Sequence, residues 1–532
     1  MRNRYLKAFT VLTLILLTGL LSGCSRNRSL YPDDKYGTCY EVFVYSFADS
    51  NGDGIGDIKG LIQKLDYIND GKDGKGNDLE VNELWLMPIF ASPSYHKYDT
   101  MDYMSVDPDY GTTDDFKKLL KECHKRGVKV ILDLALNHTS IQHPWFYDHP
   151  EYYNFSDVKK DGYACISTDT GDRYYEARFY EGMPDLDLDS KEVRKEIEKI
   201  TGYWLDMGVD GFRLDAVSYY FSDDTAKNVE FLKWFKDMVQ SQNKDVYLVG
   251  ECYTAQDTYS KYYASGIDSL FDFAFSGPDG IIASVVKGNR SMSVYAQSME
   301  KEEALYESYY PGYINAPFYT NHDMGRSAGY YAYDDGTKTK FAGALNLLMT
   351  GNAFIYYGEE TGMKGSGKDE NKRAPMQWGD DEYMCRGPEG MEMPDMKFGS
   401  VSSQTDDPAS ILNYYRKAVV LRNSHPVIAR GKTYVVSELT GDDTCAFIRT
   451  YDDKAEDSAS DNGNVSGAGS QKEGRSVMIV INGCEEQRTL MLPDNGYCEM
   501  TDQLITGEDE PFIQGNELTM PPYSIAVFKN PS

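Results

Sequence analysis

The chain has 532 residues, of which 41% are hydrophobic and 26% are charged, as in folded globular proteins that are large enough for more than one domain. Its formal net charge is −30 at pH 7. This charge argues against a nucleic-acid partner, whose phosphates require a basic surface, and is compatible with a neutral or cationic one.

The N-terminal residues have the pattern of an export signal. Three basic residues precede the apolar stretch AFTVLTLILLTGLL, which is short for a persistent membrane span. The stretch ends in Leu21-Ser22-Gly23-Cys24, which resembles a bacterial lipobox, where the cysteine is lipidated and becomes the new N-terminus. We expect a lipoprotein signal peptide over residues 1–23, a tether over 24–37, and an extracytoplasmic, cell-surface lipoprotein of a bacterium that meets the membrane through Cys24. An ordinary secretory signal is the alternative.

Eight further cysteines are scattered along the chain without the CxxC spacing of metal sites. A chain of this size does not need a disulfide framework for stability. We therefore expect most of them to be buried free thiols. They are Cys39, Cys123, Cys165, Cys252, Cys385, Cys445, Cys484 and Cys498.

Short apolar, β-rich runs alternate with longer helical patterns between residues 39 and 360. Eight such runs with intervening helices predict an α/β fold, a (β/α)8 TIM barrel, rather than a sandwich. One helix, DFKKLLKECHKRG, carries Phe116, Leu119, Leu120 and Cys123 on one face and stops at Gly127. The predicted strands are residues 39–47, 83–90, 129–137, 211–216, 246–252, 269–275, 317–323 and 354–360.

An acidic loop, DSNGDGIGDIKGL, occupies residues 49–61 after the first run. Asp49, Asn51 and Asp53 alternate and Gly54 follows, which matches the EF-hand pattern through its sixth position. The twelfth position should hold a bidentate Glu but is Gly60. By itself the loop is compatible with a broken EF-hand, a flexible turn or a calcium site in another fold.

The remaining connections indicate further domains. The polar segment after the third run is rich in Tyr and Asp, and its length predicts an inserted domain over residues 139–182. The barrel then comprises residues 38–138 and 183–430. Short β-like segments after it predict a C-terminal all-β sandwich domain over 431–532, in which residues 452–475 form a mobile loop because they contain few apolar side chains.

Charged and polar side chains stand at the ends of several predicted strands, and active residues of a TIM barrel lie at those ends. The third run ends in Asp133 and Asn137-His138, and the fourth in Arg213 and Asp215. The fifth ends in Glu251, and the seventh in Asn321-His322-Asp323. Charge at the ends of apolar strands is costly to bury, so this set predicts a functional rim.

The motifs at these ends are similar to those of the α-amylase family of retaining glycoside hydrolases and transglycosylases. DLALNH resembles the first signature of the family and GFRLDA the second, whereas VGECY resembles the segment with the catalytic Glu and FYTNHD the last signature. MPDLDLD (183–189) resembles the short motif that closes the inserted domain. The five motifs occur in the family's order, and the similarity covers roughly residues 38–530.

The resemblance implies a role for each charged residue. Asp215 would be the nucleophile, held ionised by Arg213 two residues earlier on the same strand face. Glu251 would be the general acid and then the base, and Asp323 would bind substrate hydroxyls and favour the distorted, oxocarbenium-like state. Retention requires nucleophile and acid carboxyls about 5 Å apart. The proximity of Asp215 and Asp323 should also raise the pKa of Glu251.

Other positions would contact the sugar. The resemblance implies that His138 and His322 form hydrogen bonds to the glucose in the cleaved position. Tyr98, in YHKYD, would stack on that ring, and His96 would contact its primary hydroxyl.

The resemblance also places the acidic loop, because many relatives carry a near-identical loop that binds Ca²⁺ after the first barrel strand. Waters would complete the coordination shell, since no twelfth-position Glu is present. The ion would have a structural role. The implied ligands are the side chains of Asp49, Asn51, Asp53 and Asp57 and the backbone carbonyl of Ile55.

The sequence departs from the family pattern just after the nucleophile. Many α-amylases have Ala-x-Lys-His there, which helps to build a second calcium site and lets the Lys contact sugar. This chain has Ser218 and Tyr219 instead, so the resemblance does not extend to that site or to those contacts.

Two positions bear on the bond that is cleaved. Ala216 follows the nucleophile, where a small residue goes with α-1,4 linkages in related oligoglucosidases and Val with α-1,6 linkages. Tyr95 replaces the Asp with which exo-acting relatives often clamp a terminal glucose. Both favour internal α-1,4 cleavage. By contrast, RAPMQW (373–378) and YYGEE (356–360) resemble segments of oligosaccharide-acting relatives.

We therefore expect a monomeric α-amylase whose substrate is an α-glucan. An α-glucosidase or a 4-α-glucanotransferase is the enzymatic alternative, and a surface glucan-binding lipoprotein is the non-enzymatic one. Hydrolysis, transfer and binding would be separated by the products formed from starch and maltotriose.

Overall fold

The computed structural model describes residues 35–72, 74, 78–169, 171–222, 224–379, 383–393, 395–451, 476–494, 496–497 and 499–530. Residues 36–530 belong to one compact unit as far as they are described. The predicted signal peptide, Cys24 with most of the tether, and the predicted loop 452–475 lie outside the described residues.

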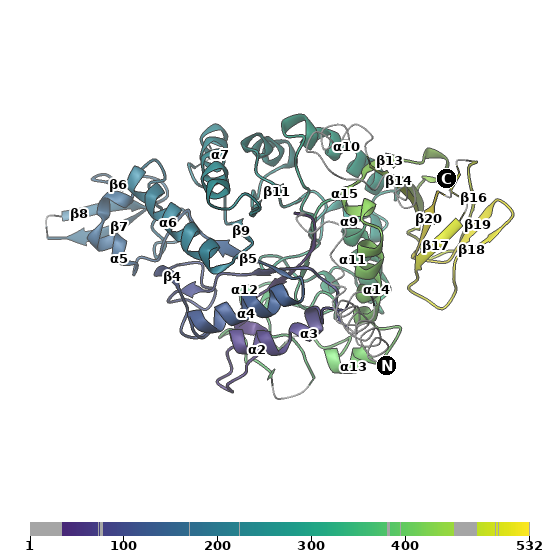
Figure 1. Cartoon of the computed structure of the whole chain (residues 1–532), viewed down its shortest axis with the longest axis horizontal. Coiled ribbons are helices and arrows are strands. Elements are labelled where there is room, and N and C mark those ends of the chain that lie inside the picture. The colour runs from purple at the N-terminus through teal and green to yellow at the C-terminus, as the bar shows by residue number, and fades with distance from the viewer. Residues whose placement is uncertain are drawn as a thin grey trace, which may run out of the picture. The chain divides into compact units, whose positions relative to one another are not determined.

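A curled parallel sheet forms the centre of the fold, which confirms the predicted barrel (Figure 1). Its strand order is β11-β10-β9-β5-β2-β1-β12. Residues 316–318 bridge the two edge strands, because Ala316 pairs with Phe271 beyond β11 and Phe318 pairs with Phe354 of β12, both in parallel. These residues take the eighth strand position. The strands are β1 (Thr38–Val42), β2 (Glu83–Leu86), β5 (Lys129–Leu134), β9 (Gly211–Leu214), β10 (Tyr247–Gly250), β11 (Ser269–Leu270) and β12 (Ala353–Tyr356).

Helices connect these strands and bury apolar faces. α4 (Thr113–Lys125) begins at a capping box formed by Thr112 and Asp115, and Gly127 follows its end with a φ of 77°. The four apolar side chains predicted to share its inner face are all buried. The other barrel-region helices are α2 (Ile58–Gln63), α3 (Leu65–Ile68), α6 (Lys191–Met207), α7 (Thr225–Gln242), α8 (Gln256–Tyr259), α9 (Ile281–Val286), α10 (Ser293–Tyr309), α11 (Thr337–Leu347), α12 (Asp369–Lys372), α13 (Val401–Thr405), α14 (Ile411–Ser424) and α15 (Val427–Arg430).

The long connection between β5 and β9 contains its own small sheet, drawn in blue in Figure 1. Its strand order is β6-β8-β7, and both pairings are antiparallel. The same connection contains a short helix, and a separate pair of antiparallel strands precedes β5 in the chain. The elements are α5 (Pro144–Asp148), β6 (Phe155–Ser156), β7 (Tyr163–Thr168) and β8 (Gly171–Glu176), with β3 (Phe90–Ala91) pairing β4 (Asp102–Val106).

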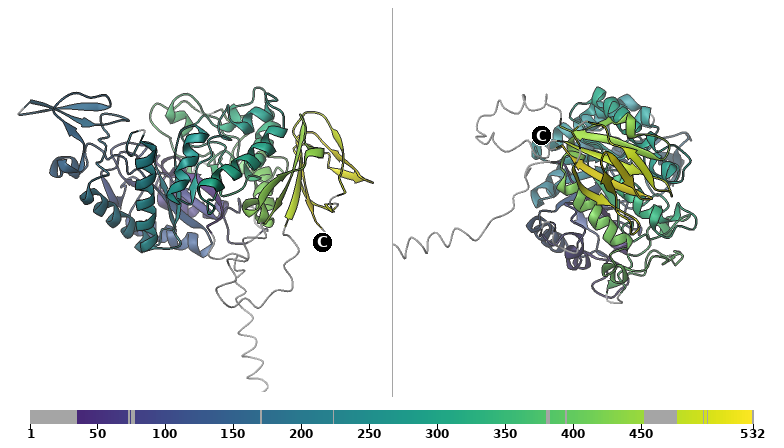
Figure 2. Two further views of the ribbon diagram at one scale, coloured as in Figure 1. Left: turned by 90° about the horizontal axis from the view of Figure 1, so that it is seen from above. Right: turned by 90° about the vertical axis from the view of Figure 1, so that its right-hand side faces the viewer.

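The C-terminal region consists of two antiparallel sheets, as predicted, and Figure 2 shows their strands in green and yellow. Glu303 on α10 binds this region, because it accepts hydrogen bonds from the backbone of Thr433 at 2.8 Å and from Arg449 at 2.7 Å. The sheets are β13-β14-β15-β20-β17 and β16-β19-β18, with β13 (Lys432–Val435), β14 (Thr444–Thr450), β15 (Ser476–Asn482), β16 (Arg488–Met491), β17 (Glu499–Leu504), β18 (Phe512–Gln514), β19 (Glu517–Met520) and β20 (Ser524–Lys529).

Three further expectations concern the whole chain. The cysteines that the structure describes are free thiols, and most of them are buried; Cys165 is exposed and Cys484 is partly exposed. Within the described ranges, no helix is both long and apolar enough to cross a membrane. The domain boundaries drawn from the sequence stay predictions.

Candidate active site

A buried guanidinium joins three carboxylates at the carboxyl end of the barrel. Arg213 on β9 is completely buried and pairs with Asp215 at 2.7 Å, with Asp133 at 2.8 Å and with Glu251 at 2.9 Å. Asp133, Arg213 and Glu251 are far apart in sequence, but they lie in or directly after three neighbouring strands, β5, β9 and β10. The structure therefore brings together the charged residues that the sequence placed at successive strand ends.

The strand register explains this convergence. Arg213 lies beside Asp133 of β5 and beside Val249 of β10. The backbone N–H of Asp215 donates to the carbonyl of Leu134 in β5. The backbone N–H of Glu251 donates in the same way to the carbonyl of Leu214 in β9, so both residues directly continue the parallel ladder. Residues two apart on a strand point to the same face, which places the side chain of Asp215 next to that of Arg213.

Ala216 makes the turn that leaves β9. Its φ is 50°, in the left-handed region that residues with a side chain rarely occupy. Its backbone N–H donates to Oε2 of Glu251 at 3.2 Å. The strained turn thus fixes the position of Glu251 relative to Asp215, and such backbone strain is typical of functional sites.

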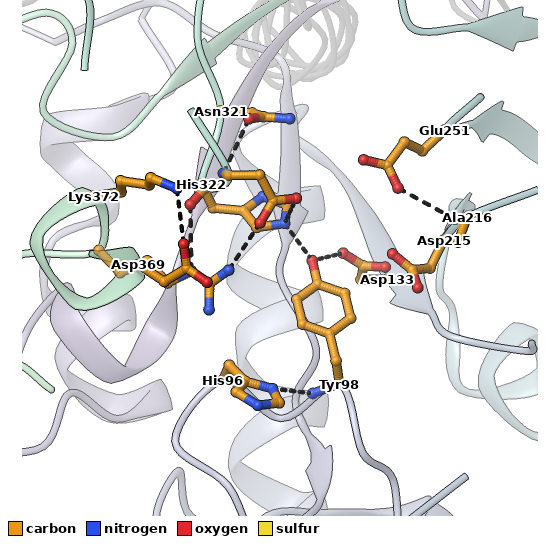
Figure 3. A network of polar contacts seen from close by, with 12 residues as sticks. His96, Tyr98, Asp133, Asp215, Ala216, Glu251, Asn321, His322, Asp369 and Lys372 are labelled. Carbon is orange, nitrogen blue, oxygen red and sulfur yellow. Dashed lines mark hydrogen bonds and ion pairs between the residues drawn. The ribbon is translucent and has the colours of Figure 1, made fainter. Parts of the chain in front are cut away.

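A second polar chain ends at Asp323. The ring of His322 contacts Oε1 of Glu41 at 2.6 Å through Nδ1 and Oδ2 of Asp323 at 3.2 Å through Nε2. Arg373 donates to Oδ1 of Asp323 at 2.9 Å and to the backbone carbonyl of His322 at 3.3 Å. Figure 3 shows His322 across the site from Glu251.

Tyr98 connects the two groups of charges. Its hydroxyl contacts Nε2 of His322 at 2.8 Å and donates to Oδ2 of Asp133 at 3.0 Å (Figure 3). The rings of Tyr98 and His322 are stacked, with centroids 5.5 Å apart. The backbone N–H of Tyr98 also donates to Nδ1 of His96 at 3.2 Å, so His96 is oriented by the same turn.

The site holds one carboxyl protonated near neutral pH and another charged. Burial, together with the charges of Asp215 and Asp323, raises the pKa of Glu251 to about 7 although Arg213 opposes this rise. Burial would also raise the pKa of Asp323, but His322 and Arg373 outweigh it and hold that pKa well below its usual range. The predicted direction for Glu251 is confirmed, with burial as the main cause.

The histidines differ in charge. Burial lowers the pKa of His322, but the carboxylates of Asp323 and Glu41 outweigh it and raise the pKa to about 10, so this ring is cationic at pH 7. Burial lowers the pKa of His96 to about 4 and also lowers that of His138, so both are neutral. Neutral imidazoles can donate and accept hydrogen bonds, which suits them to sugar hydroxyls.

A cleft of about 500 Å³ contains these groups. Six of the predicted residues line it, namely His96, Tyr98, His138, Asp215, Glu251 and Asp323. Arg213 and His322 are fully buried and are not among the residues that line it. The ring nitrogens of His138 are buried and lack a hydrogen-bond partner among the described residues, so they are available to a ligand.

Sequence reasoning missed two partners in this site. Glu41 is a charged residue inside the apolar run CYEVFV, and that contrast was a usable signal. Arg373 lies in RAPMQW and showed no sign of a contact with Asp323, 50 residues away. Asp369, four residues before Arg373, also lines the cleft.

Removing the charge of Arg213 should destabilise the protein. We expect Arg213→Met to lower the free energy of unfolding by about 3–5 kcal/mol, because two buried carboxyls, those of Asp133 and Asp215, and the partly buried carboxyl of Glu251 lose their common partner. Denaturant titration measures this change. Arg290→Met, at an exposed arginine, is the control and should change the free energy of unfolding by less than about 0.5 kcal/mol. If Arg213→Met lost no more stability than this control, Arg213 would not be the common partner that holds the three carboxyls.

The acidic loop between β1 and α2 is ordered by its own side chains. Asp49 accepts hydrogen bonds from three backbone N–H groups of the loop at 2.6–3.0 Å. Asp57 caps α2 by accepting from the N–H of Gly60 at 2.8 Å, and the side chains of Asn51 and Asp53 each accept one further N–H. In the described part of the chain, no three acidic, His or Cys side chains form a ready-made metal site.

The donors of this loop nevertheless suit Ca²⁺. They are oxygen atoms only, which a hard cation prefers. Each carboxylate oxygen has two lone pairs, so an oxygen that already accepts one N–H can still bind a cation. Ile55 would add its backbone carbonyl, and its N–H is bound by Asp53 at 2.8 Å.

Comparisons with known proteins agree with this geometry. The α-amylase catalytic-domain family matches residues 41–431. "Alpha-amylase 3" of Dictyoglomus thermophilum is 38% identical over 80% of this chain and 84% of its own length. The structure of Eubacterium rectale Amy13B has a TM-score of 0.85 and 43% identity, covering 94% of this chain and 96% of that one. A "4-alpha-glucanotransferase" of Thermotoga maritima is 30% identical over 78% of this chain and 93% of its own length. By fold, site and sequence, the chain belongs to the α-amylase family and is a glycoside hydrolase of that family.

Proposed function

We propose that this enzyme hydrolyses internal α-1,4-glucosidic bonds of starch and maltodextrins with retention of configuration. One observation carries the proposal: a single buried guanidinium, that of Arg213, binds both Asp215 and Glu251 at the floor of the cleft. Carboxyls held by one guanidinium are close neighbours. Close carboxyls favour a retaining mechanism, since an inverting enzyme needs room for a water between them.

The two carboxyls would cleave the bond in two steps, formation of a glycosyl-enzyme and its hydrolysis. Glu251 protonates the glycosidic oxygen while Asp215 attacks the anomeric carbon, which breaks the C1–O bond and forms a glycosyl ester. Glu251, now ionised, then takes a proton from a water molecule while the oxygen of that water attacks the anomeric carbon. This second displacement breaks the bond to Asp215 and releases the α-anomer. A pKa of about 7 suits Glu251 to both steps near neutral pH.

The surrounding residues would bind the glucose that is cleaved. Asp323, kept ionised by His322 and Arg373, accepts hydrogen bonds from ring hydroxyls and favours positive charge on the anomeric carbon. Tyr98 offers its ring as a stacking surface. His96 and His138, both neutral, offer nitrogens for further hydroxyl contacts.

The α-1,4 and internal preferences rest on two positions. Ala216 leaves room beside the nucleophile, as in α-1,4-specific relatives. Tyr95 contacts Arg373 at 3.5 Å and supplies no carboxylate to clamp a terminal glucose. Amylase and glucanotransferase names both occur among the relatives. The alternatives to internal hydrolysis are therefore transfer to a second glucan and cleavage from a chain end.

A time course of products tests the proposal. The enzyme is incubated with soluble starch and separately with maltotriose, and the products are separated by length. Short maltooligosaccharides with a rapid fall in starch chain length support internal hydrolysis. Products longer than maltotriose would indicate transfer, release of glucose alone would indicate end-cleavage, and unchanged substrates would leave only binding.

We also propose that the acidic loop binds a structural Ca²⁺, an ion that enzymes of this family commonly bind. Saturation at about 100 times the dissociation constant should add about 2.7 kcal/mol to the free energy of unfolding. The melting temperature should therefore rise on addition of Ca²⁺ and fall with a chelator. Asp53→Ala should lose this shift and the calorimetric signal of Ca²⁺ binding, whereas Asp161→Ala, at another exposed acid, should keep both; an unaffected Asp53→Ala protein would refute the site.

The expected location of the enzyme follows from its N-terminal residues. We propose that the enzyme acts outside the cytoplasm as a monomer, anchored to the membrane through lipidated Cys24. Its substrate would then reach it as extracellular starch or maltodextrin.

A further inference from the structure

The turn that carries His96 and Tyr98 has a strained lysine at its centre. Residues 92–101 connect the antiparallel strands β3 and β4. His96 and Tyr98 line the cleft, whereas Lys97 between them does not. The φ of Lys97 is 65°, in the left-handed region that favours glycine. A residue with a side chain keeps such a conformation only where its surroundings impose it.

The ammonium group of Lys97 is buried against two carboxylates. Its Nζ lies 3.0 Å from Oδ2 of Asp107 and 2.9 Å from Oδ2 of Asp109, and the residue is 2% exposed. The same Nζ lies over the ring of Tyr110, 5.5 Å from its centroid. A buried charge is costly unless it is paired, so these contacts fix the place of the ammonium group.

One of the two carboxylates is fixed to the strands at both ends of the loop. Asp107 directly follows β4, and its backbone N–H donates to the carbonyl of Ile89 at 2.8 Å. Its carboxylate accepts the N–H of Ser92, at the start of the loop, at 2.9 Å and the N–H of Asp109 at 2.9 Å. The ion pairs of Lys97 therefore connect the tip of the loop to its fixed base.

The backbone at Lys97 also determines how its two neighbours lie. The N–H of Lys97 donates to Oγ of Ser94 at 3.2 Å, and that Oγ contacts Nδ1 of His96 at 3.1 Å. On the other side, the hydroxyl of Tyr98 contacts His322 at 2.8 Å (Figure 3). Few backbone angles separate the two ring-bearing residues, so a change of φ at Lys97 would move the imidazole relative to the phenol ring.

We propose that Lys97 is a positioning residue, whose pairs with Asp107 and Asp109 hold the turn in its left-handed conformation and so place His96 and Tyr98 for the glucose that is cleaved. This role rests on the proposed function. Lys97 itself takes no part in the chemistry, because it does not line the cleft. The alternative is an ion-pair cluster that only stabilises the fold.

Two substitutions that both remove the ammonium group distinguish these roles. Lys97→Met keeps a side chain that disfavours the left-handed region, so the turn is free to relax. Lys97→Gly adopts that region at no steric cost and should restore the turn. Both leave Asp107 without its cation, so both should lower the melting temperature. Only Lys97→Met should lower kcat/KM strongly, about tenfold or more, while Lys97→Gly should stay within about twofold of wild type.

The losses are measured below the lowest melting temperature, with maltopentaose and with maltosyl fluoride. Both substrates place a glucose at His96 and Tyr98, so the loss in Lys97→Met should appear with both. Lys121→Met, at an exposed lysine of α4, is the control and should change neither kcat/KM nor the melting temperature. If Lys97→Met does not fold, Asp109→Ala removes one pair at an exposed carboxylate and should lower kcat/KM about threefold with both substrates.

Three results would overturn the positioning role. They are equal losses in the Met and Gly variants, wild-type kcat/KM in Lys97→Met (or in Asp109→Ala where that variant replaces it), and a loss with maltopentaose alone. A purely stabilising cluster would give the first or the second of these results. A wild-type protein that cleaves neither substrate would instead refute the proposed function.

Discussion

Asp215→Asn is expected to lower kcat for starch by about 10⁴-fold or more, because the amide cannot form the glycosyl ester. The amide oxygen can still accept the hydrogen bond that Arg213 donates to Asp215. Arg213 therefore keeps a partner at this position. The variant should therefore fold normally and retain glucan binding. Product formation from starch and a separate measurement of oligosaccharide binding give the two results.

Asp189→Asn is the control for this substitution. Asp189 also belongs to a family motif but is exposed and pairs with Lys227 away from the cleft. Its activity should stay within about twofold of wild type. Retained turnover in Asp215→Asn would show that the nucleophile lies elsewhere, and loss of glucan binding together with turnover would show that Asp215 mainly holds the site in shape.

Glu251→Gln is expected to separate the two half-reactions. With maltooligosaccharides, kcat should fall about 10³-fold or more, since the leaving oxygen receives no proton. With maltosyl fluoride, whose leaving group needs no proton, the ester on Asp215 should still form. Its breakdown lacks a base, so a covalent maltosyl-enzyme should accumulate and be visible by mass spectrometry of the intact protein.

The pH dependence follows from the same residue. Glu251 must be protonated to act as the acid, and its raised pKa of about 7 keeps it so up to neutral pH. For maltooligosaccharides, kcat/KM should therefore fall about tenfold per unit as the pH rises above about 7. Formation of the ester from maltosyl fluoride should not show this alkaline fall; an identical fall with both substrates would assign the pKa to another group.

The barrel could be predicted from the sequence because its evidence is local. Each β-rich run lies between helical patterns, and the structure has a strand or bridge within every one of the eight runs. The residues at strand ends follow from the topology, since parallel strands bring their carboxyl ends to one rim. Asp215, Glu251 and Asp323 were therefore identifiable before any contact was known.

The partners of these residues depend on contacts through space. Glu41 meets His322 across 281 residues, and Arg373, a buried residue directly after the four-residue helix α12, meets Asp323 across 50 residues. No local pattern carries such pairings. The extent of burial is also a property of the packed fold. From the sequence we therefore expected nearby charges to raise the pKa of Glu251, whereas in the structure burial has the larger effect on that pKa.

Tyr219 illustrates the reverse case. The sequence showed only that Ser218 and Tyr219 stand where many α-amylases have Lys and His. The structure adds that the ring is exposed, lines the cleft and packs against Phe179. The place of this departure from the family pattern thus becomes known only from the fold.

The configuration of the first product tests the central account most directly. Proton NMR during the first minutes of maltopentaose hydrolysis distinguishes the two anomers at the new reducing end before they equilibrate. We predict that the α-anomer appears first, as double displacement at Asp215 requires. Initial release of the β-anomer would mean direct attack by water, and would contradict the placement of Asp215 and Glu251 as nucleophile and acid on one sugar.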